Sequence, residues 1–162
     1  MKTRWTLLAV LLVGCQSQPQ EEKEALAALQ ALSSKTESGI TFVNYVEELG
    51  NTKTVVDRYK ASSNVDPGTV SAMESTLSNH IDAATFWNCQ VQSSSDETLR
   101  QCQTQQLKKI ATKHQSVVPY VKELKSKVSA GYAFQNVDNE KVLSLLWTEA
   151  KADINEVKWK IL

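Results

Sequence analysis

The sequence predicts an all-α protein, built as a single bundle of about four main helices. The 162-residue chain has only five glycines and three prolines, and it is rich in Ala, Leu, Lys, Glu and Gln, which favour helices. Apolar residues recur at steps of three and four almost throughout, and no segment alternates with a period of two over a useful length. No polar linker interrupts residues 25–162, so we expect this range to form one domain.

The first helical segment runs from about Leu26 to Tyr59. Gly39 and Gly50 lie inside it, and each weakens a helix by up to about 1 kcal/mol relative to Ala. A break near either glycine is therefore expected. The apolar positions of this segment are Leu26, Leu29, Leu32, Phe42, Val43, Val46, Leu49, Val55, Val56 and Tyr59.

The second helix follows a turn at residues 64–68, NVDPG. Asp66 before Pro67 suits a helix start, because proline supplies the φ angle of the first turn without losing a hydrogen bond. Residues 92–96 end this helix, and Ser94 with Glu97 forms a capping-box pattern for the next one. The predicted apolar stripe of the second helix consists of Val70, Met73, Leu77, Ile81, Ala84, Trp87 and Val91.

The third helix extends from about Leu99 to Val128. Pro119 should kink or divide it, because proline lacks a backbone donor and clashes with the preceding turn. Gly131 is a suitable stop. Residues 135–138 form a loop in which Asp138 can cap the last helix, whose apolar positions are Val142, Leu146, Ala150, Ile154, Val157 and Ile161.

Two cysteines flank the turn between the second and third helices. Cys89 lies six residues before Ser95 and Cys102 seven residues after it. An antiparallel helix hairpin brings such positions level, and a bridge requires Cα atoms about 4.4–6.8 Å apart. We predict a disulfide, which contributes roughly 3 kcal/mol in the chain-entropy model. The alternative is two buried free thiols, whereas the absence of C-x-x-C spacing argues against a redox-active pair.

The N-terminus has the features of a secretory signal. Lys2 and Arg4 provide a basic segment, an apolar run covers residues 5–13, and the small Gly14 follows. The run is about nine residues long, whereas a membrane-spanning helix needs about 20. Residues 1–14 are therefore predicted to be a cleaved signal peptide.

The end of this segment, Leu12-Val13-Gly14-Cys15, resembles the lipobox of bacterial lipoproteins. The resemblance implies cleavage before Cys15, a diacylglycerol thioether on its sulfur, and an acyl chain such as palmitate on its amino group. Several acyl chains make a durable membrane anchor, because each buried methylene adds about 0.8 kcal/mol. The alternative is an ordinary secretory signal with a chance cysteine near its end.

The residues after Cys15 bear on the destination of the protein. In the Gram-negative sorting pattern, Asp after the lipidated cysteine retains a lipoprotein in the inner membrane, and this chain has Gln16 and Ser17 there. The resemblance thus implies an outer-membrane anchor facing the periplasm, an implication that is void for a Gram-positive source. Residues 15–24 read as the lipidated cysteine and a polar tether, because QSQPQEEKE contains no large apolar residue.

The sequence contains no constellation typical of catalysis, so we expect neither catalytic residues nor a metal or cofactor. Two histidines, His80 and His114, are too few for a zinc site, although the hairpin places them within reach of each other. We expect both at the border between core and solvent. Residues 93–95, SSS, lack the context of a nucleophile elbow. Equal numbers of acidic and basic residues give no reason to expect nucleic acid as a partner.

A candidate partner surface consists of Lys108, Lys109 and Lys113 on the basic third helix, together with Trp159. The lysines form either a solvated face or a docking surface for an acidic partner or an anionic envelope polymer. Trp159 either packs on a neighbouring helix or contacts a partner. Trp87 and Trp147 lie in apolar stripes and are expected in the core.

These features predict a membrane-anchored envelope lipoprotein that acts as a non-enzymatic protein-interaction or assembly accessory module for another envelope protein. The alternative is an immunity, exclusion or inhibitor lipoprotein that protects the envelope against a toxin or enzyme. Gene neighbourhood would separate the two. A third hypothesis, an enzyme acting on the cell wall or lipid, requires a perturbed carboxylate or histidine in a cleft.

Overall fold

A computed structural model describes residues 20–126, 134 and 136–161 of the chain, with side chains up to Val157. Within these residues the chain forms six helices and no strand, which confirms the all-α prediction but not the number of four. The helices are α1 (Gln20–Ser38), α2 (Phe42–Lys60), α3 (Pro67–Gln92), α4 (Asp96–Lys113), α5 (Val118–Ser126) and α6 (Asn139–Ile161). The signal peptide, Cys15 and Gly131 lie outside the described residues.

The first additional helix boundary lies at Gly39. This residue has a φ of 87°, in the left-handed region that glycine adopts without a steric penalty. Thr41 then caps α2, because its hydroxyl accepts a hydrogen bond from the Asn44 amide at 3.4 Å. Gly50, the other candidate for the break, lies inside α2.

The second additional boundary lies just before Pro119. His114 has an extended backbone, with φ −112° and ψ 107°, and ends α4. Pro119 then occupies the first turn of α5, where its missing N–H costs no helical hydrogen bond. The prediction that Pro119 kinks or divides this segment is confirmed as a division.

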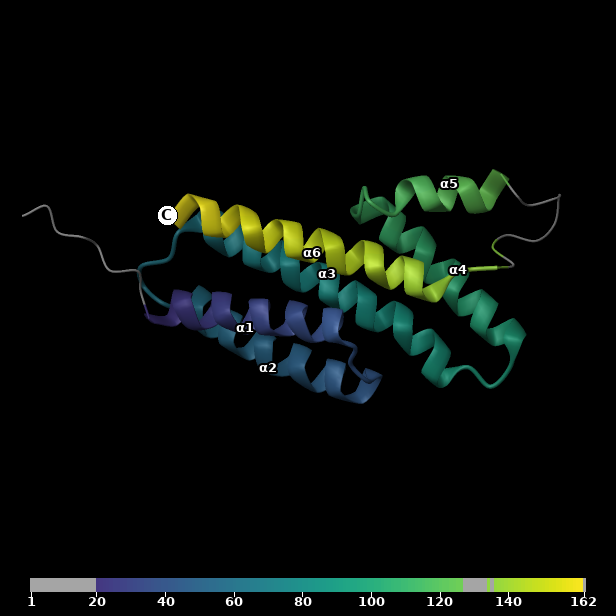
Figure 1. The fold of residues 1–162 in the computed structure, drawn as a ribbon, viewed down its shortest axis with the longest axis horizontal. Coiled ribbons are helices and arrows are strands. Elements are labelled where there is room, and N and C mark those ends of the chain that lie inside the picture. Colours follow the sequence, from purple (N-terminus) through teal and green to yellow (C-terminus); the bar gives the residue numbers. More distant parts are fainter. Residues whose placement is uncertain (1–19, 127–133, 135, 162) are drawn as a thin grey trace, which may run out of the picture.

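The two longest helices, α3 and α6, form the axis of the molecule. Figure 1 shows α1 and α2 lying along one half of this pair and α4 and α5 along the other half. Each half has its own buried cluster: Leu29 and Tyr59 lie in the first, and Phe86 and Leu107 lie in the second. Trp87 and Trp147 are partly buried and pack against both clusters, so they lie at the junction of the two halves.

Helix α1 begins earlier than its composition indicates. Residues 20–24 were expected to belong to the polar tether, but they form the first turn of α1. Glu22 is only 6% exposed, and its carboxylate accepts a hydrogen bond from the Tyr59 hydroxyl at 3.4 Å. The tether prediction is wrong for these residues because a buried tyrosine supplies the partner that lets an acid pack inside.

Two of the three predicted N-terminal helix caps are confirmed, and the third is formed by other residues. Asp66 caps α3 through the Thr69 amide at 2.6 Å, and Asp138 accepts from the Lys141 amide at 3.0 Å, as expected. The capping box before α4 is formed by Ser95 and Thr98 rather than by Ser94 and Glu97. A threonine hydroxyl returns the hydrogen bond here as a glutamate does in the usual motif.

The buried face of α3 is rotated from the predicted stripe. Ile81 and Val91 are 40% and 57% exposed, so the stripe prediction is wrong for both. Polar side chains are buried on this helix as well, and Thr76, Asn79 and His80 are among them. Hydrogen-bond partners on neighbouring helices make this burial possible.

The hairpin of α3 and α4 contains the predicted disulfide. Cys89 and Cys102 are bonded, with their Cα atoms 5.7 Å apart. No helix in the described ranges is both long and apolar enough to cross a bilayer.

Replacing both cysteines, in Cys89→Ala/Cys102→Ala, should lower the free energy of unfolding by about 3 kcal/mol because the unfolded chain gains freedom. Urea unfolding with and without a reductant measures the change. The reductant should destabilise the wild-type protein and leave the double variant unaffected. Equal unfolding midpoints for both proteins would show that the bridge does not stabilise the fold.

Candidate functional site

A groove of about 480 Å³ opens where the two halves of the bundle meet. This volume lies within the range of sites that hold small molecules or the side chains of a partner. Its apolar lining comes from Ile40, Trp87, Leu143 and Trp147. The rest of the lining is polar or glycine, and it consists of Ser33, Thr36, Glu37, Gly39, Glu140, Ser144, Thr148 and Lys151.

The ends and faces of three helices create this groove. Helix α1 stops at Ser38, so the N-terminal part of α6 extends beyond the end of α1 (Figure 1). The groove residues of α6 recur at three- and four-residue steps, from Glu140 to Lys151, and therefore share one face of the helix. Trp87 contributes the wall from α3.

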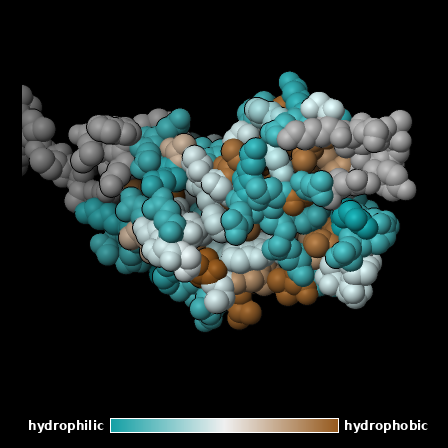
Figure 2. All heavy atoms as spheres, turned by 45° about the vertical axis from the view of Figure 1, so that its right-hand side comes forward, coloured by the Kyte–Doolittle hydropathy of each residue, from teal (hydrophilic) through white to brown (hydrophobic). Residues whose placement is uncertain are grey.

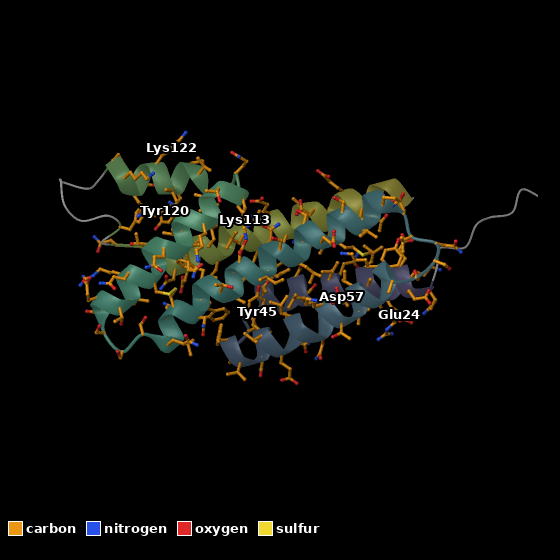
Figure 3. All side chains as sticks on the ribbon, turned by 180° about the vertical axis from the view of Figure 1, so that it is seen from behind. Glu24, Tyr45, Asp57, Lys113, Tyr120 and Lys122 are labelled. Atoms are coloured by element: carbon orange, nitrogen blue, oxygen red, sulfur yellow. A yellow bond between two sulfur atoms is a disulfide. The ribbon has the colours of Figure 1, made fainter. Side chains whose placement is uncertain are left out.

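A cluster of aromatic rings holds the two tryptophans in place. The Trp87 and Trp147 ring centroids are 6.0 Å apart in an edge-to-face arrangement. Tyr45 lies 5.8 Å from each of them, and Phe42 lies 5.6 Å from Trp87. Figure 3 shows Tyr45 between α2 and α3, inside the bundle. The apolar wall of the groove is thus fixed before any ligand arrives.

Hydrogen bonds beneath the groove link this cluster to His80. The Trp147 indole donates to the Tyr45 hydroxyl at 3.0 Å, and that hydroxyl donates to the His80 backbone carbonyl at 3.0 Å. His80 Nδ1 lies 2.9 Å from the same hydroxyl. We assign the proton to Nδ1, which then donates to Tyr45 and leaves Nε2 to accept from Ser33 Oγ at 3.4 Å. This tautomer satisfies every polar group of the network.

Burial keeps the network uncharged. Burial lowers the pKa of His80 to about 4, so the imidazole is neutral at neutral pH. Burial also raises the pKa of the Tyr45 hydroxyl, and the hydrogen bond from Trp147 opposes this only in part. The indole side chains that line the groove therefore lie over an uncharged hydrogen-bond network.

The pair of Ser33 and His80 resembles part of a nucleophilic site but lacks the rest. Ser33 lies in the interior of α1, where backbone N–H groups are used by the helix and none remains to hold an oxyanion. At 3.4 Å its hydroxyl makes only a long hydrogen bond to the imidazole. We therefore interpret this pair as support for the groove wall.

The two histidines are buried and face different parts of the fold. His114 Nε2 lies 2.8 Å from Asp82 Oδ2, and its Nδ1 lies 3.4 Å from Glu149 Oε1. His80 instead contacts α1 and α2, because residues 80 and 82 point to opposite sides of α3. The prediction that both histidines lie at the border of core and solvent is wrong, since His80 is 0% and His114 4% exposed.

Among the described side chains, no group of three or more His, Cys, Asp or Glu is placed to hold a metal ion.

The structure describes the three lysines of the predicted partner surface and only the backbone of Trp159. Lys108 and Lys109 are exposed on α4, whereas Lys113 forms an ion pair with Asp82 at 3.0 Å. Trp159 lies near the end of α6, ten residues beyond Glu149, which meets the end of α4. This spacing corresponds to about 15 Å along the helix, and the contact of Trp159 with a partner stays a prediction. The side chain of Trp159 lies outside the described residues.

Exposed apolar side chains also lie close in sequence to the residues of the aromatic cluster. Val43 is 73% exposed and Val46 44% on α2, next to the Phe42–Trp87 contact. Val91 lies one turn beyond Trp87 on α3. In Figure 2, hydrophobic side chains gather along the lower edge of the molecule, where α2 begins and α3 ends.

The groove was not predicted from the sequence, because both tryptophans were expected in the core. The available signal was the pair of hydroxyl residues, Ser144 and Thr148, beside Trp147.

The chain was also compared with known proteins. No family model, no curated protein and no solved structure matches it.

Proposed function

We propose that this protein is an envelope lipoprotein, anchored through acyl chains on Cys15, whose helical domain binds another envelope protein through the groove. It acts as a non-enzymatic interaction or assembly accessory module. The observation that carries the proposal is the pair of partly exposed tryptophans, Trp87 and Trp147, which line a groove of about 480 Å³.

The chemistry of the groove favours a protein partner. Tryptophan is enriched among the residues that dominate binding energy at interfaces, where it lies in pockets that exclude water. The two indoles are held by Tyr45 and Phe42, so little side-chain freedom is lost on binding. A groove of this kind binds by shape and apolar contact and needs no reacting group.

The position of the groove suits a tethered module. Gln20, where the chain enters the domain, and Ser38, beside the groove, are the two ends of α1 (Figure 1). The 19 residues of α1 span about 28 Å. The end of the domain that carries the groove is therefore held away from the lipid attachment at Cys15, where a periplasmic partner has access to it.

The lysines of α4 have a secondary role in this proposal. Exposed charges such as Lys108 and Lys109 mainly affect the rate of encounter with a partner and its salt dependence. Desolvated aromatic side chains in a pocket contribute more to affinity. We therefore place the main contact in the groove and treat the lysines as a peripheral surface.

Site-specific photo-crosslinking in intact cells tests the proposal. A photoreactive amino acid at Ser144, on the groove rim, should give an adduct with one envelope protein, whereas the same amino acid at the exposed Ser71 of α3 should not. The identity of the captured protein distinguishes an assembly partner from a toxin or enzyme that a protective lipoprotein would bind. Failure to capture any protein at Ser144, Thr148 or Glu140 would exclude the groove as the binding site.

A further inference from the structure

We infer that the occupant of the groove is a basic, amphipathic helix of the partner protein. This inference rests on the proposed function and specifies the chemistry of its partner. Three properties of the groove carry it, namely its length, the pattern of its lining and the charges around its rim.

The length and pattern fit a helix. The groove face of α6 runs from Glu140 to Lys151, about 16 Å or three helical turns. Between them lie an apolar floor, formed by Leu143 and Trp147, and a rim with the hydroxyl groups of Ser144 and Thr148. A partner helix with apolar residues at positions i, i+3, i+4 and i+7 presents a matching stripe.

The charges around the rim favour a cationic occupant. Both lysines beside the groove are already paired, Lys151 with Glu37 and Lys35 with Glu48. Glu140 lines the groove, and Glu47 lines an adjoining hollow that shares Gly39 and Ile40 with it. Neither acid forms an ion pair with any residue that the structure describes.

These two acids leave a surplus of negative charge on both sides of the loop at residues 39–41. Lysine or arginine at the edges of an apolar stripe would pair with Glu140 and Glu47 while the stripe fills the groove. An acidic helix, or the anionic headgroups of a membrane, would meet repulsion at the same positions. The charge pattern therefore selects a basic partner segment over either of these.

Peptide binding to the acylated, mature protein in nanodiscs of zwitterionic lipid tests this inference. The first probe is a fluorescein-labelled peptide of about 18 residues with leucines on one helical face and lysines on the other. The second keeps the leucines and replaces lysine by glutamate, and the third scrambles the basic sequence so that no apolar face forms. Anisotropy is measured against empty nanodiscs, and binding no greater than to empty nanodiscs counts as no binding.

We expect the basic amphipathic peptide to bind at least tenfold more tightly than the other two. Glu47→Lys/Glu140→Lys should weaken its binding about tenfold and improve binding of the acidic peptide, and Ser144→Trp, which fills the groove, should abolish both. The matched control is Glu156→Lys, which changes an exposed acid of α6 away from the groove and should leave binding unchanged. The four substituted side chains, those of Glu47, Glu140, Ser144 and Glu156, are all exposed. Thermal unfolding of each variant verifies that it is folded.

Equal binding of the acidic or scrambled peptide, or of the basic peptide to Glu47→Lys/Glu140→Lys, would overturn the inference. Binding of none of the peptides would overturn it as well. In these cases the proposed function is judged separately by the crosslink at Ser144 in cells. A protein captured there would show that the groove binds a partner of different chemistry. If no protein is captured, the proposed function is contradicted as well.

Discussion

Cys15→Ser should move the protein almost completely out of the membrane fraction, in which we expect the wild-type protein to be retained. The acyl chains implied by the lipobox-like sequence supply about 0.8 kcal/mol for each buried methylene, so their loss removes the anchor. Fractionation after a high-salt wash, followed by immunoblotting, measures the distribution. Incorporation of an alkyne-labelled palmitate should fall to background in the same variant.

The matched control for this experiment is the double variant Cys89→Ala/Cys102→Ala. It removes the two cysteines of the disulfide and leaves Cys15 in place, so it should remain membrane-bound and labelled. Retention of Cys15→Ser in the membrane, with unchanged labelling, would show that residue 15 does not carry the anchor. An ordinary secretory signal would then be the correct reading of residues 1–15.

Stability should fall steeply as the pH drops from 6.5 to 4, by as much as about 3 kcal/mol. The reason is His80, whose pKa is lowered by burial to about 4 in the folded protein, whereas an unfolded histidine has a pKa near 6.5. Between these values the unfolded chain binds a proton that the folded protein does not, so acid favours unfolding. The stabilisation is fully present above pH 6.5 and is lost as the pH falls through this interval.

Urea unfolding from pH 4 to pH 7, compared between the wild type and His80→Gln, isolates this contribution. The groups that contact the His80 ring are Tyr45 and Ser33, and neither titrates in this interval. Burial raises the pKa of Asp153, which gives a dependence of the opposite sign, but it is common to both proteins and cancels in the comparison. A slope of stability against pH that is the same in both proteins would contradict a neutral, buried His80.

The features that the sequence predicts correctly depend on local rules. The helical period, the Asp66 cap before Pro67 and the Asp138 cap each involve residues within one turn of one another. The disulfide follows from the near-equal distances of Cys89 and Cys102 from their turn. For the same reason a division near Pro119 was predictable, since proline imposes its constraint on the adjacent turn.

The features that the sequence did not predict depend on contacts between helices. Glu22 lies in a helix rather than in a tether because Tyr59, 37 positions later, meets its carboxylate. His80 is buried because Tyr45 and Ser33 come from two other helices to bond it. The groove arises because α1 ends at Ser38 while α6 continues past it, which no single segment reveals.

The most direct test of the groove as the binding site is quantitative mass spectrometry of the proteins that co-purify with this protein from native membranes. Three forms are compared: the wild type, Ser144→Trp with its groove filled, and Lys109→Glu on the basic face of α4. If the groove carries the interaction, one envelope protein is enriched with the wild type and with Lys109→Glu and is lost with Ser144→Trp. Retention of that protein by Ser144→Trp, together with its loss from Lys109→Glu, would contradict the account and place the interaction on α4.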